Sequence, residues 1–128
     1  MLNQEKVFKT LANSYLNGFC NYALENCGNR NIIAANEGNA VSIAAGYYFA
    51  SKEIPLVYMQ NSGMGNAINP LVSLADKDVY AVPMILLIGW RGQGDTESNH
   101  PQHKLQGAIT PGLLDIMHIP YTVLEDDD

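Results

Sequence analysis

Residues 31–50 read NIIAANEGNAVSIAAGYYFA, and this stretch decides the fold. The apolar run at 32–35 shows no alternation, which is typical of a strand buried on both faces of a parallel sheet. The alanine-rich stretch that begins at Gly38 favours a closely packed helix. A single carboxylate, Glu37, stands at the predicted turn between these two apolar segments.

The order of strand and then helix recurs along the chain. We predict a strand at 54–60 (IPLVYMQ), a turn at 61–66 (NSGMGN) and a helix at 67–75 that Pro70 interrupts near its start. A third buried strand is expected within YAVPMILLIGW, followed by a loop, a helix over 104–117 and a fourth strand at 121–124 (YTVL). Ahead of them, apolar residues spaced by three and four predict a helix over 8–27. The pattern indicates the α/β class, with a three-layer parallel sheet covered by helices on both faces.

Composition limits the partners of this chain. It has 128 residues, of which 47% are apolar and 16% charged, so we expect one domain over 1–128. The net charge of −6 argues against nucleic acid as a partner. The longest apolar run, at 79–90, is too short for a bilayer span, and the first residues do not resemble a secretory signal. We therefore expect no membrane association and a cytoplasmic location. Because the chain ends directly after its last predicted strand, we expect a domain truncated at the C-terminus.

Three predicted turns follow strands, where open parallel sheets bind ligands. Glu37, in the first, could be a helix-start acid that the helix dipole favours, or a carboxyl with little water around it that exchanges protons. The second turn contains a GxG pattern that is too short for a dinucleotide fingerprint and is better explained as a tight turn that backbone can approach closely. Arg91, after the third strand, could bind an anion or be a solvated loop residue. His100 and His103 lack a third ligand at suitable spacing, so we expect no metal site.

Several of these segments resemble a known family. NEGNAVSIAAGYYFA is similar to the pyrimidine-binding (PYR) domain of thiamine-diphosphate enzymes, in which a glutamate precedes a helix of the pattern ExxAxxxAxGYxxA. QNSGMGNAINPLVSLAD resembles the glycine-rich turn of that domain. Together with VPMILLIGWRG and HPQHKLQGAIT, these segments are most similar, in order, to the phosphonopyruvate decarboxylase family over residues 31–124.

The resemblance implies roles for particular residues. Glu37 would donate a hydrogen bond or a proton to N1′ of the aminopyrimidine of thiamine diphosphate, and His103 would handle protons or bind the substrate carboxylate. The implied cofactor contacts are Asn61, Ser62, Gly63 and Gly65, and the implied ligands of the substrate's anionic ends are Arg91, Ser14 and Gln102. Where the family shows a GVPDS-like loop after a strand, this chain has TLANS at 10–14, in which only Ser14 matches.

The resemblance also implies a partner. The family holds Mg²⁺ and the diphosphate with a GDG motif and a later Asn pair, and this chain has neither. We therefore expect a diphosphate-binding (PP) domain or subunit to hold the Mg²⁺ in a homo- or hetero-oligomer, at least a dimer. The implied reaction converts 3-phosphonopyruvate to phosphonoacetaldehyde and CO₂ in phosphonate biosynthesis. The alternatives are a sulfopyruvate decarboxylase subunit and a non-catalytic PYR-like module that only binds a partner.

Overall fold

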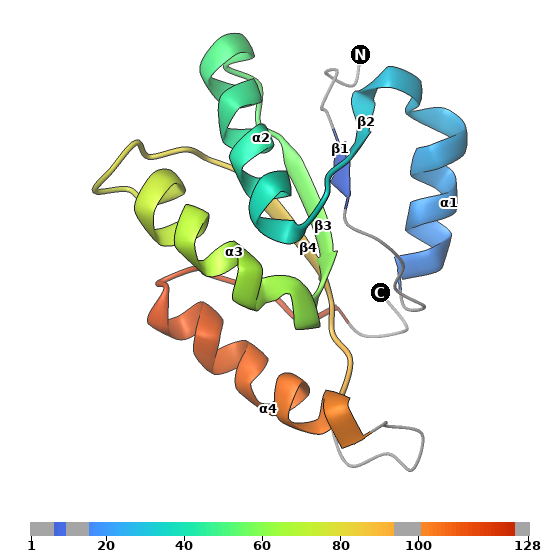
Figure 1. Ribbon diagram of the computed structural model, residues 1–128, viewed down its shortest axis with the longest axis vertical. Helices are drawn as coiled ribbons and strands as arrows, with labels where there is room; N and C mark the ends of the chain where they lie inside the picture. The colour runs from blue at the N-terminus through green and yellow to red at the C-terminus, as the bar shows by residue number, and fades with distance from the viewer. Residues whose placement is uncertain (1–6, 10–15, 94–100, 125–128) are drawn as a thin grey trace.

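The structure is a computed structural model that describes residues 7–9 by their backbone, and residues 16–93 and 101–124 in full. Its strands form a parallel sheet in the order β2-β1-β3-β4 (Figure 1). Their bounds are β1 Val7–Lys9, β2 Asn31–Ile33, β3 Leu56–Gln60 and β4 Ile85–Gly89.

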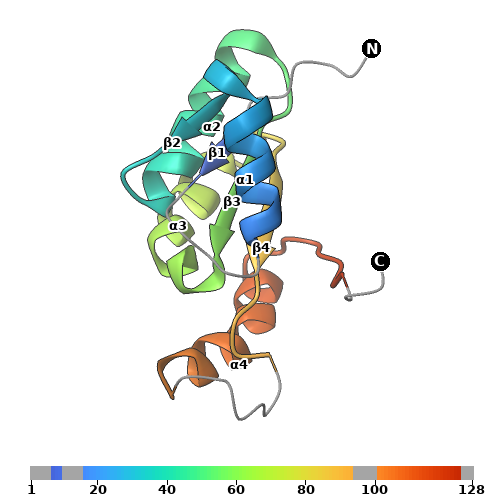
Figure 2. The ribbon, with the colours of Figure 1, turned by 90° about the vertical axis from the view of Figure 1, so that its right-hand side faces the viewer.

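Helices cover both faces of this sheet. The helix α1 (Asn17–Asn26) lies on one face, and α2 (Glu37–Ser51) and α3 (Met64–Pro70) lie on the other (Figure 2). The connections from β1 to β2 and from β2 to β3 run in opposite directions across the sheet, so right-handed crossovers place their helices on opposite faces. The predicted three-layer α/β fold is confirmed. The last helix, α4 (Pro101–Ile116), lies beyond the carboxyl end of β3 (Figure 1).

The position of β3 inside the sheet, with helices on both faces, explains why its sequence is apolar at nearly every position. Its side chains alternate between the two faces. Tyr58 packs with Cys20 and Ala23 of α1, while Val57 and Met59 pack against the opposite layer. That layer contributes the buried side chains Ala40, Val41, Ala44, Met64, Ala67, Leu71 and Leu114. The alanines of α2 allow this helix to lie close to the sheet.

The helix predicted over 8–27 is wrong at its beginning. Val7–Lys9 forms the strand β1, and α1 begins only at Asn17. The apolar spacing is helical, but β1 is hydrogen-bonded on both sides, to β2 and β3, and this pairing overrides the local pattern. The predicted end of the helix is close to the observed one, because α1 ends at Asn26 and Gly28 follows with a φ of +50°.

The strand predicted at 121–124 is also wrong. These residues have no regular secondary structure, and within the described ranges no backbone hydrogen bond joins them to β4. The preceding Pro120 has no N–H to donate to a ladder. The helix predicted at 67–75 begins earlier, at Met64, and continues after Pro70 as the π-helical turn η4 (Leu71–Ala75). Because Pro70 lacks an N–H, the regular hydrogen-bond pattern changes there.

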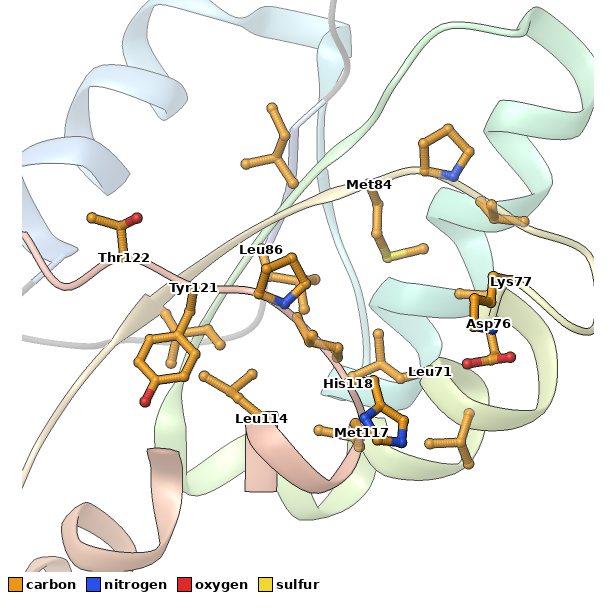
Figure 3. A pocket seen from close by; sticks show the side chains of 18 residues that line it. Leu71, Asp76, Lys77, Met84, Leu86, Leu114, Met117, His118, Tyr121 and Thr122 are labelled. Carbon is orange, nitrogen blue, oxygen red and sulfur yellow. The ribbon is translucent and has the colours of Figure 1, made fainter. Parts of the chain in front are cut away.

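A cavity of about 490 Å³ lies between η4, β4 and the residues after α4 (Figure 3). Its lining is mainly apolar and includes Leu71, Met84, Leu86 and Met117. None of the site residues predicted from the sequence lines it. Within the described ranges, no helix combines the length and the apolar character that crossing a membrane requires.

Candidate functional site

Glu37 is the first residue of α2, directly after the turn that follows β2. The preceding Asn36 caps the helix, because its side-chain Oδ1 accepts a hydrogen bond of 2.9 Å from the backbone N–H of Asn39. A carboxylate in the first turn also interacts favourably with the positive end of the helix dipole, by about 0.3–1 kcal/mol. Local structure therefore fixes where the backbone of Glu37 lies.

The turn after β3 holds the Glu37 side chain from the opposite side. Asn66 Nδ2 donates a hydrogen bond of 2.9 Å to Glu37 Oε2. Gly63 lies directly against the same side chain, since a Cβ added at Gly63 would overlap Cγ, Cδ and Oε1 of Glu37. At Gly38 an added Cβ would stand 2.6 Å from the backbone oxygen of Asn66. Two glycines thus allow the beginnings of α2 and α3 to meet around one carboxylate.

The two oxygens of the Glu37 carboxylate differ. Within the described ranges, Asn66 is the only hydrogen-bond partner of this side chain, and no cation pairs with it. Oε2 is therefore held, whereas Oε1 accepts no hydrogen bond from a described residue. Glu37 is half-buried, so it retains more contact with water in this chain than the sequence predicts.

Asn61 joins the turns after β3 and β4. Its side chain is only 1% exposed. Its Oδ1 accepts from the backbone N–H of Arg91 at 3.1 Å, and its Nδ2 donates to the backbone oxygen of Arg91 at 2.9 Å and to Thr110 Oγ1 at 3.0 Å. Both amide protons are therefore engaged within the protein. Asn61 fixes the position of Arg91, which is half-buried, and connects both turns to α4.

Gly92 and Gly107 bring α4 against the turn after β4. A Cβ added at either residue would overlap backbone atoms of the other segment, and Gly92 also lies against the backbone of His103. Trp90 Nε1 donates a hydrogen bond of 2.9 Å to the backbone oxygen of Gly107. These contacts place the half-buried His103, in the first turn of α4, next to the turn that carries Arg91.

The other predicted site residues lie on the surface or outside the described ranges. Ser62 and Gly65 are exposed in the turn after β3 and at the beginning of α3, and Gln102 is exposed in the first turn of α4. Ser14 lies outside the described residues. The structure therefore brings together Glu37 with Gly63, and Asn61 with Arg91, through one shared turn.

Sequence reasoning missed Asn66 and Thr110. Asn66 ends the quoted turn NSGMGN, and its link to Glu37 depends on how closely two helices approach, which no local pattern reports. Thr110 lies inside a helix, where its Oγ1 donates a hydrogen bond of 2.6 Å to the backbone oxygen of Gln106. Threonine at such a position is common in helices, so the sequence does not reveal its second hydrogen bond, to Asn61. Within the described ranges, no group of three or more His, Cys, Asp or Glu side chains could hold a metal ion.

Comparisons with known proteins identify the family of this chain. The model of the thiamine pyrophosphate enzyme N-terminal TPP binding domain matches residues 2–117. Phosphonopyruvate decarboxylase of Streptomyces viridochromogenes is 34% identical over 113 residues, which cover 88% of this chain and 28% of that protein. The phosphonopyruvate decarboxylase of Streptomyces hygroscopicus is 32% identical over 113 residues, which cover 88% of this chain and 27% of that protein.

Sulfopyruvate decarboxylase subunit alpha of Methanocaldococcus jannaschii is 39% identical over 90 residues, which cover 70% of this chain and 50% of that subunit. The chain thus spans half or less of the length of these three relatives. Because the domain model matches residues 2–117 of the 128, the chain belongs to the thiamine pyrophosphate enzyme family, in which it corresponds to the N-terminal TPP binding domain.

Proposed function

We propose that this chain supplies the pyrimidine-binding half of a thiamine-diphosphate-dependent 2-oxo acid decarboxylase. The observation that carries this proposal is the Glu37 carboxylate, which is held on Oε2 and lies against Gly63 with Oε1 available. It stands at the carboxyl edge of a parallel sheet, where open α/β folds bind their ligands.

The residues at this edge suit one part of the cofactor. An aminopyrimidine is a flat ring with nitrogen atoms at its rim, and Oε1 of Glu37 offers a hydrogen-bonding partner for such a nitrogen. Gly63 and Gly65 would let backbone approach the ring, and the exposed Ser62 adds a polar group on the same turn. Asn61 would act indirectly, because its amide already holds the two turns together.

The described residues offer no comparable site for the diphosphate or its metal ion. We infer that a diphosphate-binding domain or subunit holds Mg²⁺ and the diphosphate, in a homo- or hetero-oligomer of at least two chains. A relative named as a subunit alpha supports an arrangement in which separate chains contribute to one enzyme. We also infer a cytoplasmic location, since both cysteines of the chain, Cys20 and Cys27, are free thiols, as is usual in reducing compartments.

Bound thiamine diphosphate would supply the carbon nucleophile and the electron sink for loss of CO₂. Glu37 Oε1 would hold a proton at the pyrimidine N1′, and it would exchange that proton most readily once a partner surface excludes water. His103 would handle a proton or bind the substrate carboxylate. Arg91 would bind the anionic end of the substrate through its planar guanidinium, and Gln102 of α4 and Ser14 are further candidates for this contact.

The proposed substrate is 3-phosphonopyruvate, which would give phosphonoacetaldehyde and CO₂ in phosphonate biosynthesis. The two phosphonopyruvate decarboxylases each align with 88% of the chain, whereas the sulfopyruvate decarboxylase subunit aligns with 70%. Sulfopyruvate is the second candidate, because that subunit has the higher identity, 39% against 34%.

A substrate comparison tests the proposal. The chain is combined with a diphosphate-binding region, from the Streptomyces viridochromogenes relative or from a separate subunit, and with Mg²⁺ and thiamine diphosphate. Release of CO₂ is then measured with each keto acid. We expect kcat/KM for 3-phosphonopyruvate to exceed that for sulfopyruvate by at least about tenfold, or 1.4 kcal/mol of transition-state binding. Faster turnover of sulfopyruvate would favour the second candidate. An assembly that binds the cofactor and decarboxylates neither acid would indicate a non-catalytic module.

A further inference from the structure

We propose that Asn66 is a positioning residue that decides which oxygen of Glu37 carries the proton. This inference rests on the proposed function, because it concerns how the same carboxyl acts on a bound ring. Asn66 itself is not expected to touch substrate or cofactor. It lies in the first turn of α3, whereas Glu37 begins α2, so the contact links two helices that follow different strands.

The geometry makes this link specific. The bond from Asn66 Nδ2 to Glu37 Oε2 measures 2.9 Å, which is a normal length for a hydrogen bond to a carboxylate. Gly38 lets the backbone of Asn66 come close to α2, since even a Cβ at Gly38 would stand 2.6 Å from the Asn66 carbonyl oxygen. Gly63 lies against the side chain of Glu37 at its Cγ, Cδ and Oε1 atoms. The side chain of Glu37 is thus confined from one side and held by one donor from another.

The chemistry follows from the donor. The side-chain nitrogen of Asn66 can donate a hydrogen bond but cannot accept one. While this bond exists, Glu37 Oε2 has to be the accepting oxygen in both the charged and the neutral carboxyl. The proton of the neutral form is therefore placed on Oε1, which has no hydrogen-bond partner among the described residues. Oε1 is then the oxygen that can give its proton to a ring nitrogen.

The first test needs neither cofactor nor partner. In ¹⁵N-labelled chain, the side-chain amide signals of Asn66 are identified by their loss in Asn66→Ala and followed as the pH is varied. We expect these signals to shift as Glu37 loses its proton, and to lose that response in Glu37→Gln. Asn69 lies three residues further along α3 and bonds Ser73 instead, so its amide signals serve as the matched control. The inference would be overturned if the chemical shifts of the Asn66 amide did not change with pH, or if they changed with pH in Glu37→Gln as well.

The second test uses the assembled enzyme. Loss of a hydrogen bond to a charged group corresponds to about a 10- to 100-fold change, so we expect Asn66→Ala to lower kcat by this factor. The KM for the keto acid should change less than about threefold, and the acidic limb of the pH profile of kcat should move. Asn66→Asp keeps the size of the side chain, but it has no N–H to donate and adds a negative charge beside Glu37, so its loss should be larger.

Asn69→Ala should leave kcat and the pH profile unchanged. Because Asn66 is exposed, its variants should fold, which thermal melting of each chain verifies. Turnover and a pH profile in Asn66→Ala that match those of Asn69→Ala would overturn the positioning role. If the unsubstituted assembly does not turn over either keto acid, the proposed function fails instead, and the amide titration still decides whether Asn66 holds Glu37.

Discussion

Gly63→Ala separates the stability of the fold from the placement of Glu37. The backbone of Gly63 has φ −85° and ψ −10°, which alanine adopts without strain. The three atoms nearest to the added methyl group all belong to the side chain of Glu37: Cγ, Cδ and Oε1. The substitution therefore leaves the backbone in a conformation that alanine permits, and it forces the side chain of Glu37 to move.

The expected effect on stability is small. Replacing glycine by alanine in a permitted conformation stabilises a protein by about 0.4–1 kcal/mol through the unfolded state. Overpacking costs about 1–3 kcal/mol, and the lower end applies because Glu37 is half-buried and can rotate. The two terms nearly cancel, so the free energy of unfolding should change by less than about 1 kcal/mol.

The expected effect on activity is large. Rotation of Glu37 breaks its bond to Asn66 and displaces Oε1, so the contribution of a placed acid, about 10²- to 10⁴-fold, is lost. Urea unfolding and CO₂ release by the assembled enzyme measure the two effects. Gly46→Ala, in the exposed middle of α2 with open space around it, should raise stability by about 0.5–1 kcal/mol. Turnover of Gly63→Ala within twofold of the unsubstituted enzyme would refute the reasoning that Gly63 holds the Glu37 carboxyl in its proposed catalytic position.

Three further substitutions test the packing around the site, each by urea unfolding. Asn61→Ala removes a buried amide that makes three hydrogen bonds and should cost about 2–4 kcal/mol, whereas a loss under 0.5 kcal/mol would contradict its bridging role. Gly107→Ala should lower the free energy of unfolding by about 3 kcal/mol or more, because its Cβ would overlap the backbone of Gly92. Gly112→Ala is the control, because Gly112 lies on the same helix with open space around it, and this variant should leave stability unchanged. Equal effects of the two substitutions would disprove the close approach of Gly107 and Gly92. Burial raises the pKa of Tyr58 above its usual value of 10, so above pH 10 the unfolded chain loses a proton that the folded chain keeps. Stability should then fall with rising pH, by up to about 1.4 kcal/mol per pH unit, and Tyr58→Phe should reduce that slope; an unchanged slope would show that another group is responsible.

Much of the architecture could be predicted from the sequence, because β2, β3 and β4 contain continuous apolar runs. Only β3 is largely buried, since β2 and β4 lie at the edges of the described sheet and expose Ile33 and Ile85. Strand β1 could not be predicted in this way, since it has three residues and is defined by its neighbours on both sides rather than by its own composition. The predicted strand at 121–124 failed for the opposite reason, as a strand-like sequence forms no ladder without backbone partners.

The candidate site likewise contains residues that the sequence predicts and residues whose functions only the structure reveals. Glu37, Gly63 and Arg91 could be located in advance, because each stands in a turn after a predicted strand. The functions of Asn66 and Asn61 could not, since each makes its decisive hydrogen bond to a residue about 30 positions away. Such contacts depend on the approach of whole helices and turns. They become visible only in three dimensions.

The central claim is that Glu37 supplies a proton to the bound pyrimidine, and Glu37→Gln tests it most directly. The glutamine keeps the length and the hydrogen-bonding capacity of the side chain but cannot exchange an acidic proton. Glu53→Gln is the matched control, because Glu53 follows α2 at its other end and accepts a hydrogen bond from Tyr47. With saturating thiamine diphosphate and Mg²⁺ in the assembled enzyme, we predict that Glu37→Gln lowers the rate of CO₂ release by at least about 100-fold, while Glu53→Gln leaves it unchanged. A Glu37→Gln enzyme that works within twofold of the unsubstituted rate would contradict the claim.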